Sequence, residues 1–150
     1  MTITSAESSA PIVAPDWASR PVVLVVEDEF LVRVLEVDAL RDAGLRVVEA
    51  QDADEAFDIL RRRPEIVAVL TDVDMPGSLN GFEFARLIKQ GWPELPVLVI
   101  SGKVEPGPGD LPPGVAFVQK PIRPAALVEH IRALLPAPVS PQQSTPASKP

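Results

Sequence analysis

The sequence predicts an α/β fold, a doubly wound parallel sheet with helices on both faces. Two observations support this prediction. Short apolar runs rich in β-branched residues alternate with segments of helical spacing between residues 21 and 135, which is the order of strands joined by crossover helices. The runs are apolar at successive positions, as expected for strands that are buried on both faces. A chain of 150 residues fits one such domain with a single core.

Five strands and four helices are expected along the chain. The predicted strands cover residues 21–28, 45–50, 65–72, 95–102 and 114–120. The predicted helices cover residues 29–44, 52–64, 80–91 and 123–135. These boundaries lie where continuous apolar runs give way to apolar residues spaced three or four positions apart.

The predicted helices carry suitable end signals. In the first helix four apolar residues can share one face, namely Leu31, Val34, Leu35 and Leu40. Gly44 suits the end of this helix, because glycine readily adopts the conformation of a C-terminal cap. The second helix begins with acidic residues and ends with three arginines, an order that the helix dipole favours. The last helix has Pro124 early enough to be tolerated in its first turn.

The segment between the fourth and fifth predicted strands lacks the signals of a helix. Residues 103–114 contain four prolines and three glycines, and both residue types disfavour helix formation. We therefore expect an irregular loop or a short turn there. Residues 1–19 mix serine, alanine and proline without periodicity, and residues 137–150 are rich in proline and serine. We expect both to be disordered tails around a domain of residues 20–136.

The composition argues against several classes of protein. The formal net charge of −7 argues against nucleic acid as a direct partner, because a surface that follows phosphates needs a basic patch. The chain has no cysteine, which excludes disulfides and thiolate chemistry. Its longest apolar runs are far shorter than the roughly 20 residues of a membrane-spanning helix, and no secretory signal is evident. We expect a soluble cytoplasmic protein with no membrane partner.

Polar residues stand at the carboxyl ends of four of the five predicted strands. They are Glu27, Asp28 and Glu29 after the first strand, Asp72 after the third, Ser101 after the fourth and Lys120 after the fifth. The carboxyl ends of parallel strands meet at one edge of the sheet, where ligands bind in such folds. Each residue alone also has a structural explanation, such as a solvated helix start, a turn or a surface lysine. Together they form a chemically coherent set.

The chemistry that this set supports is phosphoryl transfer to a carboxylate. Neighbouring carboxylates repel one another unless a hard cation such as Mg²⁺ binds them. A carboxylate can accept a phosphoryl group to form an aspartyl phosphate, and this transfer depends on positioning and charge neutralisation. Asp72 is the best candidate acceptor, because it stands alone at a central strand while Glu27 and Asp28 can share the metal. Lys120 and Ser101 are suited to the phosphoryl oxygens.

In these motifs the sequence resembles the receiver domain of bacterial response regulators in two-component systems, over roughly residues 21–135. The resemblance lies in “VVED”, “LTDVDMPG”, “ISG” and “FVQKP”. It implies a flavodoxin-like sheet of five parallel strands in the order 2-1-3-4-5, here with the fourth helix degenerate or missing. It also implies a signalling phosphoprotein rather than an enzyme, with self-phosphorylation and self-dephosphorylation as its only chemistry.

The resemblance implies roles for individual residues. Asp72 would be the phosphoacceptor, and Ser101 and Lys120 would bind the phosphoryl oxygens. The Mg²⁺ cofactor would be held by Glu27, Asp28, Asp72 and the backbone carbonyl of Asp74. Ser101 and Phe117 would form the conformational switch, although ordinary core packing explains Phe117 equally well. A cis peptide bond before Pro121 would direct Lys120 into the site.

The resemblance also implies partners. A sensor histidine kinase or a phosphotransfer protein would supply the phosphoryl group. The receiver would then signal by a conformational change that an unidentified protein reads, or by relaying the phosphoryl group onward. No output domain is expected after the receiver, so we expect a single-domain regulator. Loss of the fourth helix alters the face that commonly dimerises in the family, and we expect a monomer or a weak homodimer.

Two other functions remain open from the sequence. “DVDM” matches the Asp-x-Asp motif of phosphatases of the haloacid dehalogenase type, but that motif normally ends the first strand, and here it ends the third. A receiver that is never phosphorylated could act only as a binding or dimerisation module. His130, the single histidine, is expected to be a surface residue of the last helix rather than a phosphotransfer histidine.

Overall fold

The computed structural model describes residues 21–73, 80–103 and 105–135. Within them, five strands form one sheet in the order β2-β1-β3-β4-β5, with every pair parallel. The strands are β1 (Val22–Val26), β2 (Arg46–Ala50), β3 (Ile66–Asp72), β4 (Val97–Ser101) and β5 (Val115–Gln119). The predicted flavodoxin-like order is confirmed.

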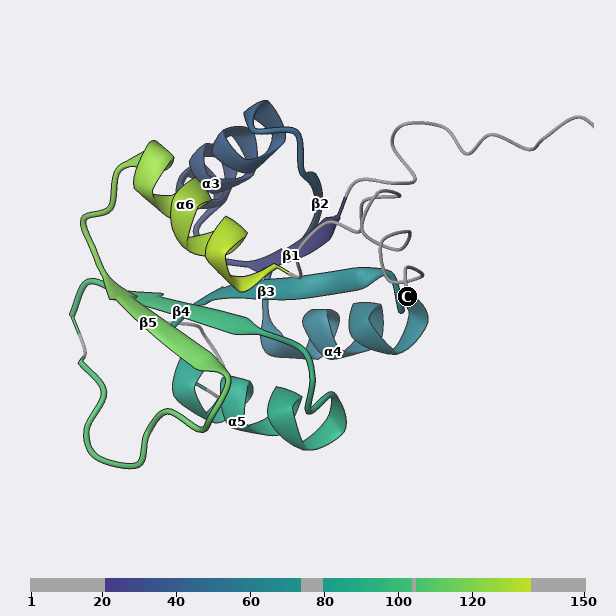
Figure 1. Ribbon diagram of the computed structural model, residues 1–150, viewed down its shortest axis with the longest axis vertical. Coiled ribbons are helices and arrows are strands. Elements are labelled where there is room, and N and C mark those ends of the chain that lie inside the picture. The colour runs from purple at the N-terminus through teal and green to yellow at the C-terminus, as the bar shows by residue number, and fades with distance from the viewer. Residues whose placement is uncertain (1–20, 74–79, 104, 136–150) are drawn as a thin grey trace, which may run out of the picture.

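Four helices cover the sheet within the described residues. They are α3 (Phe30–Asp42), α4 (Ala53–Arg62), α5 (Gly81–Gly91) and α6 (Pro124–Leu134). Helices α3 and α6 lie on one face, and α4 and α5 lie on the other (Figure 1). Residues 105–114, between β4 and β5, contain no helix, which confirms that the fourth crossover helix is missing there. None of the described helices has the length and apolar character needed to cross a bilayer.

The central strand β1 shows why its sequence is apolar at successive positions. All five of its residues are buried. Leu24 and Val26 pack in the cluster under α4 and α5, whereas Val23 and Val25 pack in the cluster under α3 and α6. Because neighbouring side chains of a strand point to opposite faces, a strand covered on both sides needs an apolar residue at every position.

The face that α3 turns to the sheet differs from the predicted one. Leu40 is buried as predicted, but Leu31 and Leu35 are 71% and 68% exposed. The buried positions are instead Val37, Leu40 and, unexpectedly, the acidic Glu36. A helix turns by about 100° per residue. Rotating the helix by about one residue from the predicted orientation therefore moves Leu31 and Leu35 from the core to the surface. The prediction of that apolar face was wrong.

Two glycines are required by the backbone around them, and the second lies next to the site. Gly44 ends the turn after α3 with φ +92°, the left-handed region that glycine adopts at low cost. Gly81 begins α5 in direct contact with the backbone that carries Asp72. A Cβ at Gly81 would lie 2.6 Å from the Cα of Val73, so a larger residue there would displace the end of β3 or the start of α5.

Candidate functional site

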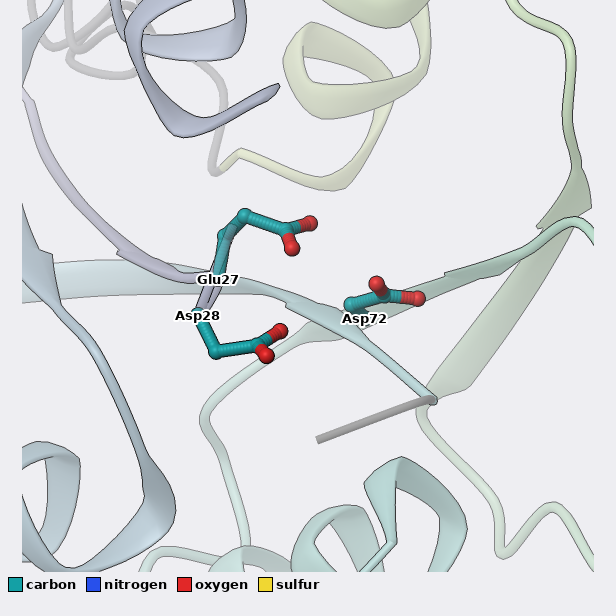
Figure 2. Close-up of side chains that lie close together, drawn as sticks. All are labelled: Glu27, Asp28 and Asp72. Carbon is teal, nitrogen blue, oxygen red and sulfur yellow. The ribbon is translucent and has the colours of Figure 1, made fainter. Parts of the chain in front are cut away.

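Three carboxylates meet at the carboxyl edge of the sheet. Glu27 and Asp28 directly follow β1 and Asp72 ends β3, and one carboxylate oxygen from each lies within 4.8 Å of the others. Figure 2 shows the three side chains around a common space at the ends of the two strands. Glu27 and Asp72 are only 1% and 6% exposed, whereas Asp28 is open to solvent. The cluster is therefore anchored in the core and accessible from one side.

The register of β1 and β3 brings these acids together. Val26 lies beside Thr71, so the next residue of each strand, Glu27 and Asp72, is placed at the same level. The backbone N–H of Glu27 donates to the carbonyl of Ala50 at the end of β2, over 3.0 Å. The first carboxylate is thereby fixed between its two neighbouring strands.

Lys120, which directly follows the edge strand β5, brings a positive charge to the carboxylates. Its Nζ lies 3.5 Å from Oδ2 of Asp72 and 4.0 Å from Oε1 of Glu27. The Lys120–Pro121 peptide bond is cis. The backbone N–H of Lys120 donates to the carbonyl of Ser101 over 2.8 Å, which ties the residue after β5 to the end of β4.

The remaining predicted site residues take different positions. Ser101 is fully buried at the end of β4, and its Oγ accepts a hydrogen bond from the backbone N–H of Lys103 over 3.3 Å. Phe117 is half-buried on β5, with its ring centroid 6.2 Å from that of Phe82 on α5. Asp74 lies outside the described residues.

Burial shifts the protonation of the innermost carboxyl. Desolvation raises the pKa of Glu27 to about 8, the N–H of Glu29 and the charge of Lys120 oppose the rise, and the carboxylates of Asp72 and Glu36 add to it. Among the described residues, Oε1 of Glu27 is buried without a hydrogen-bond partner. A buried oxygen that lacks a hydrogen bond beside two other carboxylates is a costly arrangement, which the Lys120 ammonium at 4.0 Å offsets only in part, and a cation at this point would satisfy it. The donor set is all oxygen, as Mg²⁺ prefers, so the residues fit that ion.

Glu36 is a residue of this region that the sequence prediction missed. It lies on the buried side of α3, 8% exposed, and lines a cavity of about 530 Å³ together with Leu35, Lys120 and Pro121. Desolvation raises its pKa to about 7, the charge of Lys120 opposes this and that of Asp72 adds to it. In the sequence, the only sign of this residue is an acid at position 36 between two apolar neighbours. The predicted buried face of the helix did not include it.

Comparison with known proteins agrees with this architecture. The family model of the response regulator receiver domain matches residues 23–132. The hydrogenase transcriptional regulatory protein HoxA of Cupriavidus necator is 36% identical over 124 residues, which cover 77% of this chain and 24% of that protein. The chain therefore spans about a quarter of the length of this curated relative.

Solved structures give the same result. The receiver domain of the hybrid histidine kinase CckA is 33% identical, with a TM-score of 0.66 over 77% of this chain and 99% of that one. The receiver domain of NtrX from Brucella abortus is 32% identical, with a TM-score of 0.66 over 75% and 97%. Together with the parallel sheet and the acidic edge described above, these matches show that the chain belongs to the response regulator receiver domain family of two-component systems.

Proposed function

We propose that this receiver accepts a phosphoryl group on Asp72 in a reaction that requires Mg²⁺. The observation that carries the proposal is the cluster of three carboxylates within 4.8 Å, with the Lys120 ammonium 3.5 Å from Asp72. Acids alone would suit many cation sites. An acid cluster with one lysine at its edge suits a cation and an anionic phosphoryl group side by side.

The residues that would hold Mg²⁺ are Glu27, Asp28, Asp72 and the backbone carbonyl of Asp74, the last of which lies outside the described residues. When bound, the ion would neutralise charge on the transferring phosphoryl group. Glu27 must give up its proton to serve as a ligand, and its pKa of about 8 means that metal binding releases a proton at neutral pH.

The chemical step is a displacement at phosphorus. An Oδ atom of Asp72 forms the new O–P bond while the N–P bond of a phosphohistidine breaks, and the electron pair stays on the imidazole nitrogen, which then takes up a proton. Lys120 and Ser101 would bind the phosphoryl oxygens, and Ser101 with Phe117 would transmit the change. The domain acts as an acceptor of a signal and turns over no other substrate.

The donor would be a sensor histidine kinase or a phosphotransfer protein, in the cytoplasm where this family usually works. Exposed apolar side chains on α3, namely Phe30, Leu31 and Leu35, begin two residues after Asp28. Exposed apolar patches commonly mark protein-binding surfaces, and this one begins close in the chain to the metal-binding Asp28. The net charge of −7 disfavours nucleic acid as a partner. The receiver unit is proposed to span residues 20–136 as a monomer or weak homodimer, with an unidentified downstream target.

The test is mass spectrometry of the intact protein after incubation with Mg²⁺ and acetyl phosphate. The wild type should gain one phosphoryl group, and Asp72→Ala should gain none. Asp38→Ala is the matched control, because Asp38 is an exposed acid on α3 away from the cluster, and it should behave like the wild type. If the wild type gains no adduct and shows no Mg²⁺-dependent spectroscopic change, the non-phosphorylated binding module becomes the better proposal.

The phosphatase alternative has little support. Asp72 ends β3 rather than the first strand, and the acids that follow β1 would have no function in that mechanism. Steady turnover of a small phosphate ester by the wild type would nevertheless restore it.

A further inference from the structure

We propose that Arg33 is a positioning residue for the metal-binding acids, because it fixes the peptide that joins Glu27 to Asp28. This inference rests on the proposed Mg²⁺-dependent function. It concerns a side chain on the first turn of α3 that does not reach the carboxylate cluster itself.

The Arg33 guanidinium binds two partners, one directly after β1 and one on β2. Its Nη1 donates to the backbone carbonyl of Glu27 over 2.7 Å, and its Nε donates to Oε1 of Glu49 on β2 over 3.0 Å. The Arg33 side chain is 12% exposed, compared with 39% for Glu49, and its guanidinium lies 5.6 Å from the centre of the Phe30 ring. A planar guanidinium held at two nitrogens keeps a fixed orientation.

The carbonyl that Arg33 binds matters because of its place in the chain. It belongs to the peptide unit leading into Asp28, so its orientation sets the direction in which the Asp28 side chain leaves the backbone. Glu27 is already held by its N–H to Ala50 and by its Oε2, which accepts from the Glu29 N–H over 3.1 Å. In the described part of the chain, no hydrogen bond holds the Asp28 carboxylate. The peptide is therefore the main restraint on this exposed ligand, and Arg33 secures it.

Charge and positioning predict opposite effects of removing Arg33. A cation near a metal site repels the metal, so loss of the charge alone would strengthen Mg²⁺ binding. Loss of a group that orients a ligand weakens metal binding, typically by 10- to 100-fold for partners of this kind. The sign of the change therefore separates the two roles.

The experiment measures the Mg²⁺ dissociation constant of the full chain by isothermal titration calorimetry. We expect Arg33→Met to bind Mg²⁺ about 10-fold more weakly than the wild type. Arg33→Lys should also bind Mg²⁺ more weakly than the wild type. Lysine keeps the positive charge but lacks the planar guanidinium that donates from two nitrogens in a fixed orientation. Arg41→Met is the matched control: Arg41 also lies on α3 and near Glu49, at 3.8 Å, but donates to the carbonyl of Val47 instead. It should bind within about twofold of the wild type.

Several results would overturn the inference. Equal or tighter Mg²⁺ binding by Arg33→Met, or an equal loss in Arg41→Met, would refute the positioning role while leaving the proposed function intact. A wild type that binds no Mg²⁺ would remove the proposed function and this inference with it. Circular dichroism confirms that each variant is folded, and if Arg33→Met does not fold, Glu49→Met serves instead. That substitution removes the acceptor of the Arg33 Nε, together with the longer ion pair to Arg41 that the Arg41→Met control also removes. It should weaken Mg²⁺ binding by a few-fold, whereas no change would overturn the inference.

Discussion

The buried acid of α3 should make the protein less stable as the pH rises. The pKa of Glu36 is raised from its ordinary value of 4.5 to about 7, mainly because the carboxylate is desolvated. At pH values between 4.5 and about 7, the carboxyl of Glu36 therefore keeps its proton in the folded state but has lost it in the unfolded state. The stabilisation by protonated Glu36 is fully present below pH 4.5 and disappears as the pH rises through 7.

The size of this effect is set by the shift in pKa. Each pKa unit corresponds to about 1.4 kcal/mol, so the change from 4.5 to about 7 amounts to about 3 kcal/mol at full ionisation. Glu36→Gln replaces the carboxyl by a neutral group of the same shape. Its advantage over the wild type should be under about 1 kcal/mol at pH 5 and should grow by about 2.5 kcal/mol by pH 8. Neutralising Glu36 also removes a charge that raises the pKa of Glu27, which acts in the same direction.

The assay is urea unfolding followed by far-UV circular dichroism at pH 5, 6, 7 and 8, in buffer with a metal chelator. The quantity compared is the difference in free energy of unfolding between Glu36→Gln and the wild type. Asp38→Asn is the control, because it neutralises an exposed acid two residues away on the same helix and should change stability by less than about 0.5 kcal/mol. A Glu36→Gln difference that is the same at every pH would refute the reasoning.

Four further predictions concern packing, capping and the metal. Gly81→Ala should lower the free energy of unfolding by about 2 kcal/mol or more in urea, because its Cβ would lie 2.6 Å from the Cα of Val73; an unchanged midpoint would show that the contact yields easily. Asn80→Ala removes the side-chain half of the capping box at the start of α5 and should cost about 1 kcal/mol in the same assay. Phe84→Ala, which empties a fully buried position, should cost about 3 to 5 kcal/mol, and a loss under about 1 kcal/mol would contradict the packing described. Mg²⁺ at about 100 times its dissociation constant should stabilise the wild type by about 2.7 kcal/mol in thermal unfolding, and the same concentration should stabilise Asp28→Asn far less.

The sequence predicts the sheet well because the sheet is buried on both sides. All five residues of β1 are apolar and buried, which is the pattern of a strand covered on both faces. The acids and Lys120 could be placed at one edge for a related reason, since chain direction alone decides which ends of parallel strands meet. Local patterns of apolar residues along the chain are therefore enough to identify the strands and the order of the elements. Chain direction then identifies the edge that carries the site.

The features that could not be predicted depend on the phase of a helix or on contacts across space. Helix α3 has apolar residues on more than one side, so its spacing did not reveal that Leu31 and Leu35 face outward and Glu36 inward. The contact of Gly81 with the backbone after β3 and the bond from Arg33 to the Glu27 carbonyl join segments whose meeting depends on the assembled fold. Single-sequence periodicity carries no information on either.

The acidic edge of the sheet has a consequence for how the protein folds. Asp28 and Asp72 are 44 positions apart in the sequence, and Lys120 comes after another 48. Contacts of such long range form late, because the loops between them must first be closed. During synthesis the acids emerge well before the edge strand β5 that precedes the lysine, and a nascent chain or a trapped intermediate would carry the carboxylates without their cation. The complete site therefore exists only in a molecule in which β5 has joined the sheet and has brought Lys120 beside Asp72 and Glu27.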